Sequence, residues 1–135
     1  MAIISTKGIY GLIAIVILAK ETKDELLSIK QIAQKGNIPQ NYLEQILVVM
    51  KKNGIITSIR GANGGYKLAK CIKDITVYDV LNSLECCLEY KKQQPSMLDP
   101  FWEYTHDNIK KIFSLNIDEL IVFLDNNSNN LIYHI

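Results

Sequence analysis

The stretch SIKQIAQKGNIPQNYLEQILVVMKKNGIITSIRGANGGYKLAK, residues 28–70, decides the fold of this chain. Ser28 and Gln31 can each bond the backbone N–H group of the other, which predicts the start of a short helix that ends at Gly36. Over residues 42–50, apolar residues recur at spacings of three and four, which predicts a second amphipathic helix. Two helices joined by so short a connection form a helix-turn-helix pattern.

The rest of this stretch predicts a hairpin directly after the second helix. Gly54 stops the helix, and residues 55–59 are β-prone. Residues 60–65 hold three glycines in a turn, after which residues 66–68 can pair back as a second strand. The predicted fold class is therefore mainly α with a small β-hairpin wing, which is a winged helix-turn-helix.

Four further helices are predicted outside this stretch. Residues 6–20 are apolar on nearly every side, so their helix should lie at the centre of the fold. Thr76 starts another helix, whose apolar residues share one side. Residues 99–114 predict a long helix with more aromatic surface than a lone helix can bury, and residues 117–125 predict a short last helix.

Four motifs in fixed order resemble those of one protein family. They are STKGIYGL at 5–12, YLEQIL at 42–47, RGANGGYKLA at 60–69 and ITVYDVLNSLE at 75–85. The chain resembles the IscR/NsrR/CymR, or Rrf-two, family of bacterial transcriptional regulators over almost its whole length. Within that family it is most similar to the cluster-free branch that represses cysteine metabolism.

The resemblance implies a homodimeric repressor that binds an imperfect palindrome in double-stranded DNA. It also implies that the long helix is the crossing helix of the dimer. We expect a winged helix-turn-helix DNA-binding domain at 1–85, a loop with dimerisation helices at 86–125, and a flexible tail at 126–135.

Charge is distributed unevenly along the chain. Residues 1–75 carry ten lysines and one arginine against five acids, a net charge of +6, whereas residues 76–135 carry four lysines against nine acids, a net charge of −5. Scatter among solvated side chains is one explanation. Because the excess coincides with the predicted winged helix, it favours a polyanion such as DNA as the partner.

The outward side of the second helix in the motif has the chemistry of base readout. Gln40, Asn41, Glu44 and Gln45 alternate with apolar residues; amides can bond adenine, and a carboxylate can accept from cytosine. The resemblance implies that the positions of Asn41, Tyr42, Glu44 and Gln45 lie at or near DNA. A solvated helix with amide side chains is the alternative explanation of the same pattern.

Arg60, the only arginine of the chain, stands at the glycine-rich turn and can enter a narrow A·T-rich minor groove.

Near the start of the first predicted helix, hydroxyls and a lysine can bond phosphate, although Tyr10 fits ordinary core packing equally well. The candidate DNA contacts are Thr6, Lys7, Tyr10, Ser28, Gln31, Gln40, Asn41, Tyr42, Glu44, Gln45, Arg60, Gly61, Asn63 and Lys67.

The cysteines argue against a metal cluster. Cys86 and Cys87 are adjacent in a loop without periodicity, and Cys71 lies in the preceding segment, so the three do not readily supply three or four thiolates to one cluster. His106 lacks the usual zinc spacing to any of them. We therefore expect no cofactor and no metal. Buried, inert cysteine is the favoured interpretation, and a thiol- or metal-responsive repressor is the alternative.

The end of the sequence predicts a contact with another protein. Polar residues 125–130 are conformationally loose, and the apolar residues 131–135 follow them. An apolar peptide with a free carboxylate can fill a pocket, and the resemblance implies that Tyr133, His134 and Ile135 bind cysteine synthase. Folding of this segment back onto its own dimer is an equally weighted alternative.

Other function classes fit less well. No nucleophile–base pair or phosphate-cradling loop is present, so we do not expect an enzyme. The longest apolar run, about eleven residues at 9–19, is too short to cross a bilayer, so no membrane partner is expected. The odd cysteine count and the lack of a secretion signal indicate the cytoplasm. A protein-interaction scaffold is the alternative outside DNA binding.

Overall fold

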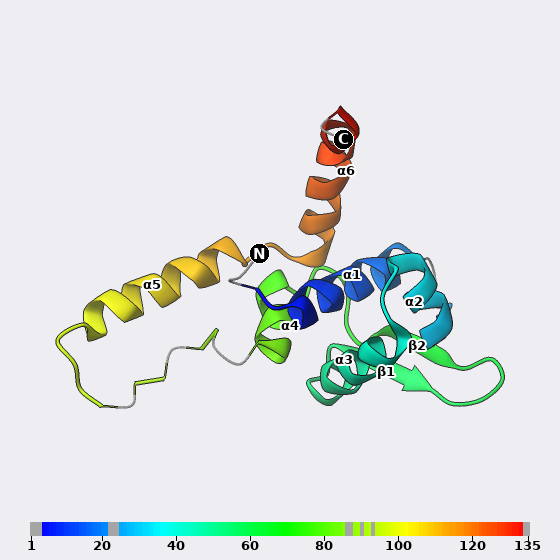
Figure 1. Cartoon of the computed structure of the whole chain (residues 1–135), viewed down its shortest axis with the longest axis horizontal. Helices are drawn as coiled ribbons and strands as arrows, with labels where there is room; N and C mark the ends of the chain where they lie inside the picture. Colours follow the sequence, from blue (N-terminus) through cyan, green and yellow to red (C-terminus); the bar gives the residue numbers. More distant parts are fainter. Residues whose placement is uncertain (1–3, 22–24, 86–87, 90, 93, 134–135) are drawn as a thin grey trace.

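The computed structural model describes residues 4–21, 25–85, 88–89, 91–92 and 94–133, the last five of these as backbone only. Six helices and one two-stranded antiparallel sheet occur within these ranges, which confirms the predicted fold class (Figure 1). In chain order the elements are α1 (Thr6–Lys20), α2 (Ile29–Gly36), α3 (Gln40–Lys52), β1 (Ile56–Ile59), β2 (Gly65–Leu68), α4 (Val77–Leu84), α5 (Asp99–Ile112) and α6 (Ile117–Tyr133).

The predicted capping box at the start of α2 is present. The Gln31 N–H donates to Ser28 Oγ at 3.2 Å, and the Ser28 N–H donates to Gln31 Oε1 at 2.9 Å. The helix ends at Gly36, as predicted, and the next residue, Asn37, takes the left-handed conformation, with φ 51° and ψ 47°. Asparagine tolerates this conformation better than most residues, so it turns the chain toward α3.

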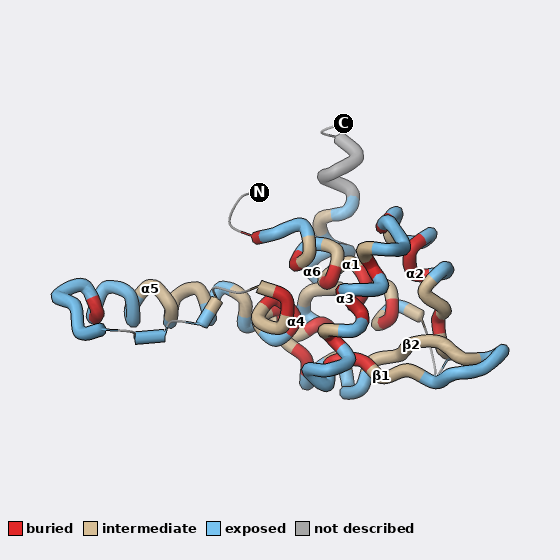
Figure 2. The backbone as a smooth tube through the Cα atoms, turned by 60° about the horizontal axis from the view of Figure 1, so that its bottom comes forward, coloured by how far each residue is buried: buried red, intermediate tan, exposed pale blue. Residues whose placement is uncertain are grey.

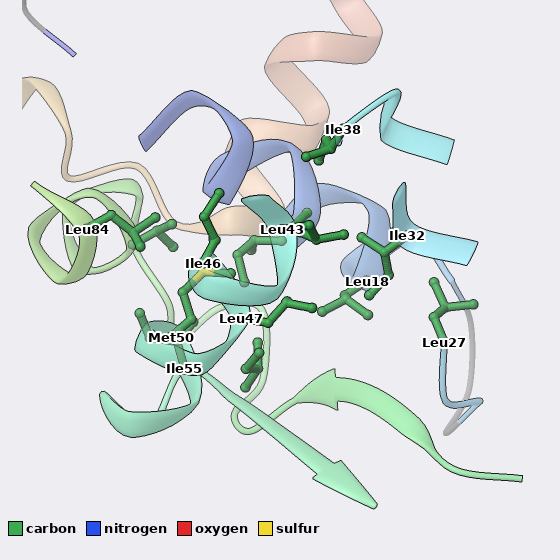
Figure 3. Packing of buried hydrophobic residues seen from close by; sticks show 14 of the residues in the cluster. Leu18, Leu27, Ile32, Ile38, Leu43, Ile46, Leu47, Met50, Ile55 and Leu84 are labelled. Carbon is green, nitrogen blue, oxygen red and sulfur yellow. The ribbon is translucent and has the colours of Figure 1, made fainter. Parts of the chain in front are cut away.

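The inward side of α3 forms the centre of the core (Figure 3). Leu43, Ile46, Leu47 and Met50 are all completely buried, and they lie at the predicted helical spacing. Burial of each such side chain stabilises the fold by about 1.5–3 kcal/mol. Because α3 packs against α1, α2 and α4, its orientation relative to all three is fixed.

Close contact between α1 and α4 depends on small residues in α1. A Cβ atom added to Gly11 would lie 2.1 Å from Leu84 Cδ1, so only glycine lets α4 approach this closely. Ala14, Ile15 and Leu18 continue the same buried side of α1. The prediction that the first helix is central is therefore confirmed.

The wing is joined to the start of α2. Strands β1 and β2 pair from Ile56 with Leu68 to Ile59 with Gly65. On its other edge, Tyr66 exchanges two backbone hydrogen bonds with Leu27, at 2.7 and 3.0 Å. The hairpin is thus bonded along both strands and to the residue that precedes the Ser28 cap.

Residues 113–116 connect α5 and α6 and are anchored on the start of α4. The N–H groups of Val77 and Tyr78 donate to the carbonyls of Leu115 and Phe113, both at 2.8 Å. From this anchor the first turns of α6 contact α1 and the helix then extends away from it, whereas α5 projects away from the body on another side and is largely uncovered (Figures 1 and 2). Burial, followed by the charges of Glu89 and Asp79, raises the pKa of Tyr78 above its ordinary value.

The last helix is longer than predicted. The prediction that it ends near Asp125 is wrong, because α6 continues through the polar stretch to Tyr133, where a flexible tail was expected. Asn127 Nδ2 donates to the Phe123 carbonyl at 2.8 Å, and Ser128 Oγ donates to the Asp125 carbonyl at 3.0 Å. Polar side chains that favour loops here bond the preceding helical turn instead.

None of the described helices combines the length and the hydropathy needed to span a bilayer.

Candidate nucleic-acid interface

The outward side of α3 is the most direct candidate for base readout. Gln40, Asn41, Glu44 and Gln45 are all exposed, while the opposite side of the helix is in the core. Amide and carboxylate groups at these positions match the hydrogen-bonding edges of bases in a major groove. The structure therefore gathers the four predicted base-reading residues on one accessible surface.

Tyr42 lies at the side of this surface and packs edge-on against Tyr10 of α1. Their ring centroids are 5.6 Å apart at an interplanar angle of 79°, and both residues are half-buried. This contact supports the packing role that the sequence allowed for Tyr10. It also couples the start of α1, with exposed Thr6 and half-buried Lys7, to the reading helix.

The tip of the wing presents Arg60, Gly61 and Asn63, all exposed. Gly61 has φ 124°, a conformation that other residues rarely adopt. At Gly64 a Cβ would lie 2.1 Å from the Ile59 carbonyl oxygen, so the tight turn requires glycine there as well. The glycine pattern therefore shapes the turn that carries Arg60.

The wing and α3 are joined by a direct hydrogen bond. Lys51 Nζ, in the last turn of α3, donates to Ser58 Oγ of β1 at 2.6 Å. Ser28, Arg60 and Tyr66 line the same hollow, of about 360 Å³, between these elements. Because this bond and the packing of α3 against β1 hold the two elements together, the outward side of α3 and the wing tip form one surface.

Two predicted residues are not free members of that surface. Lys67 is half-buried on β2 and lines a different hollow, together with Glu21, Lys70 and the exposed Cys71. Gln31 uses its side-chain oxygen in the α2 capping box, so only its amide N–H groups are available to a ligand.

The N-terminus of α1 already holds a carboxylate, which the sequence analysis missed. The N–H and Oγ of Ser5 both donate to Glu85 Oε1, at 2.8 and 2.7 Å. A Cβ at Gly8 would lie 2.4 Å from that oxygen, so glycine makes room for it. Because the positive end of the helix dipole faces this carboxylate, the candidate phosphate contacts at α1 are the side chains of Thr6 and Lys7.

The described residues do not assemble a metal site. No group of three or more His, Cys, Asp or Glu side chains with suitable geometry occurs among them. Cys71 and His106 lie on separate elements, and Cys86 and Cys87 fall outside the described residues. An iron–sulfur cluster takes four ligands, and the His, Cys, Asp and Glu side chains among the described residues do not form a set that fits one.

An apolar groove lies on the side of α1 that faces away from the core. It has a volume of about 440 Å³ and runs between α1 and α6. The residues that line it are Ile9, Leu12, Ile13, Val16, Ile17, Lys35, Gly36, Leu120 and Leu124. On α5, Phe101, Trp102, Tyr104 and Ile112 are between 43% and 67% exposed. Among the described residues, the α1–α6 groove and this side of α5 are therefore apolar surfaces that the fold leaves open.

A helix-turn-helix with a polar exposed reading side, followed by an arginine-tipped wing, defines a winged-helix DNA-binding protein. The family model Rrf2, described as an iron-dependent transcriptional regulator, matches residues 4–126. The chain belongs to the Rrf2 family of transcriptional regulators, as its motifs predicted.

Individual relatives agree with this assignment. CymR of Bacillus subtilis, an HTH-type transcriptional regulator, is 32% identical over 136 residues, which cover 98% of this chain and 99% of CymR. The solved structure of B. subtilis CymR has a TM-score of 0.74 and 34% identity, covering 89% of this chain and 96% of CymR. The T. potens IscR structure has a TM-score of 0.73 and 34% identity, covering 87% and 85%.

The Glu85 cap should stabilise the fold. Replacing Glu85 by alanine removes the acceptor for two Ser5 donors and is expected to lower the free energy of unfolding by about 1 kcal/mol. Urea denaturation measures this change. Glu89→Ala is the matched control, because Glu89 is an exposed glutamate that accepts from the Asn82 amide and does not bond Ser5. Equal effects of the two substitutions would contradict the capping role.

Proposed function

We propose that this protein is a homodimeric, sequence-specific repressor that inserts α3 into the major groove of an imperfectly palindromic operator. The observation that carries the proposal is the fixed pairing of the α3 reading side with the Arg60 wing through the Lys51–Ser58 hydrogen bond. One winged helix reads one half-site, and the two half-sites lie about one or two turns of duplex apart. Residues 1–85 form the DNA-binding part.

The proposed contacts divide by chemistry. Gln40, Asn41, Glu44 and Gln45 read base edges, and Arg60 enters the flanking minor groove with Gly61 and Asn63 beside it. Phosphate contacts come from Thr6, Lys7, Ser28, Gln31 and Lys67. For Lys67 this requires the backbone of DNA to pass the wing on the side of the second hollow. Tyr10 and Tyr42 hold α1 against α3.

The second copy is proposed to cover the two open apolar surfaces. The described residues leave the aromatic side of α5 exposed, and α5 projects away from the α1–α6 groove of its own chain (Figure 1). An α5 helix from a second copy, lying against this groove, buries both at once. The reciprocal contact forms the same interface twice, as a twofold dimer requires.

The regulated genes are proposed to be those of cysteine or sulfur metabolism. The similarity to CymR extends over nearly the full length of both chains, and the solved structure of B. subtilis CymR is described as that of the global cysteine regulator. A thiol- or metal-responsive repressor is the second candidate. It is favoured by the iron-dependent description of the matched family and would use Cys86 and Cys87.

Cysteine synthase is the proposed protein partner, bound through Tyr133, His134 and Ile135. The CymR similarity, which covers 98% of this chain and 99% of CymR, supports the proposal. Since the backbone is helical to Tyr133, the partner would meet the end of α6 and not a long loose peptide.

Two substitutions should separate base reading from wing binding. Gln45→Ala is expected to relax selectivity at one base position by about 1–3 kcal/mol, because a bidentate contact is lost. Arg60→Ala should weaken binding chiefly to duplexes with A·T-rich flanks. Band-shift titrations on selected and scrambled duplexes measure both effects. Equal affinity of the wild type for every sequence would refute base readout.

The dimer is tested at α5. Trp102→Glu places a charge on the aromatic side and is expected to raise the dimer dissociation constant about thirtyfold or more. Analytical ultracentrifugation measures the constant. Glu103→Gln, at an exposed neighbouring position, is the control and should leave it unchanged. A Trp102→Glu variant that dimerises as tightly as the wild type would exclude this interface.

The partner proposal is tested by deleting residues 133–135. Calorimetry with purified cysteine synthase should show binding by the full chain and a loss of at least about tenfold in affinity after the deletion, the factor that corresponds to roughly 1.4 kcal/mol. DNA affinity should not change, which serves as the control. Unaltered binding of the synthase would eliminate these residues as its contact.

A further inference from the structure

Val48 occupies the middle of the reading side of α3. Its side chain is 61% exposed and takes no part in the core that the opposite side of the helix builds. It follows Glu44 by four residues and Gln45 by three, so it lies one turn beyond both and between their directions. The polar reading stripe therefore has an apolar group at its centre.

Solvent exposure gives no reason for a valine here. A β-branched residue loses rotamer freedom in a helix, and lysine, glutamine, glutamate or alanine would form this turn more readily. Polar residues occupy the rest of the stripe, from Asn41 to Lys52. Such a stripe is complementary to a ligand surface that also presents a single apolar group among its hydrogen-bonding atoms.

The major groove offers such a surface at thymine. Each A·T pair presents the C5-methyl group of thymine beside hydrogen-bonding atoms of the base pair, whereas G·C pairs present no methyl group. We propose that Val48 contacts a thymine methyl and thereby selects thymine at one position of each half-site. This inference rests on the proposed function, because it requires α3 to lie in the major groove.

The test uses a duplex selected from a random library by the wild-type protein. Each thymine is replaced in turn by 2′-deoxyuridine, which lacks only the methyl group. The wild type should lose about fourfold in affinity at one thymine per half-site, the factor for returning one buried methyl group to water. The Val48→Ala variant should show no loss at that thymine, because its shortened side chain makes no contact there.

Val122→Ala is the matched control. Val122 lies on α6 and is 52% exposed, so its substitution removes a similar apolar group away from the reading side. This variant should keep the wild-type response to every deoxyuridine. Alanine is also the better helix former, so Val48→Ala retains α3.

The outcomes distinguish failure of the Val48 contact from failure of the proposed DNA-binding function. Indifference of the wild type to deoxyuridine at every thymine, or an unchanged response in Val48→Ala, overturns the assignment of Val48 while base readout by the neighbouring polar residues stands. Failure of the wild type to enrich any duplex from the library overturns the proposed function, and the Val48 contact with it.

Discussion

The burial of one side of α3 is the constraint on which the rest of the structure depends. Leu43, Ile46, Leu47 and Met50 have no exposed surface, so the helix cannot rotate without opening the core. Their burial forces the polar side outward. The strand that follows α3 then leads directly into the wing, and the Lys51–Ser58 bond keeps the wing beside the reading side.

Helix α1 connects this surface to the opposite side of the molecule. Its inner side packs on α3 and α4, Tyr10 contacts Tyr42, and its outer side lines the groove shared with α6. A second copy bound in that groove would therefore contact α1, the helix that packs behind α3. In such a dimer, the spacing of the two reading heads is set by contacts at α1 and not by a flexible linker.

Local patterns made much of the fold predictable, since caps and apolar spacing act over a few residues. The Ser28 capping box and the glycine turn at the wing are examples. Contacts distant in sequence were not predictable. An example is the pair of hydrogen bonds that Ser5, at the start of α1, donates to Glu85, which is 80 residues away. The α6 extension was missed because Asn127 and Ser128 bond helical carbonyls, although both residue types favour loops. Lys67 also needed the three-dimensional structure, because the face of β2 on which it lies depends on packing.

The central claim is that burial of one side of α3 presents its polar side, together with the wing, to DNA. Chemical footprinting tests this claim most directly. On a selected duplex, dimethyl sulfate probes guanine N7 in the major groove, and hydroxyl radicals probe the backbone along the minor groove. The account predicts major-groove protection at two half-sites about one or two turns apart, each flanked by minor-groove protection. Protection of the minor groove alone, or a single half-site without a partner, would contradict it.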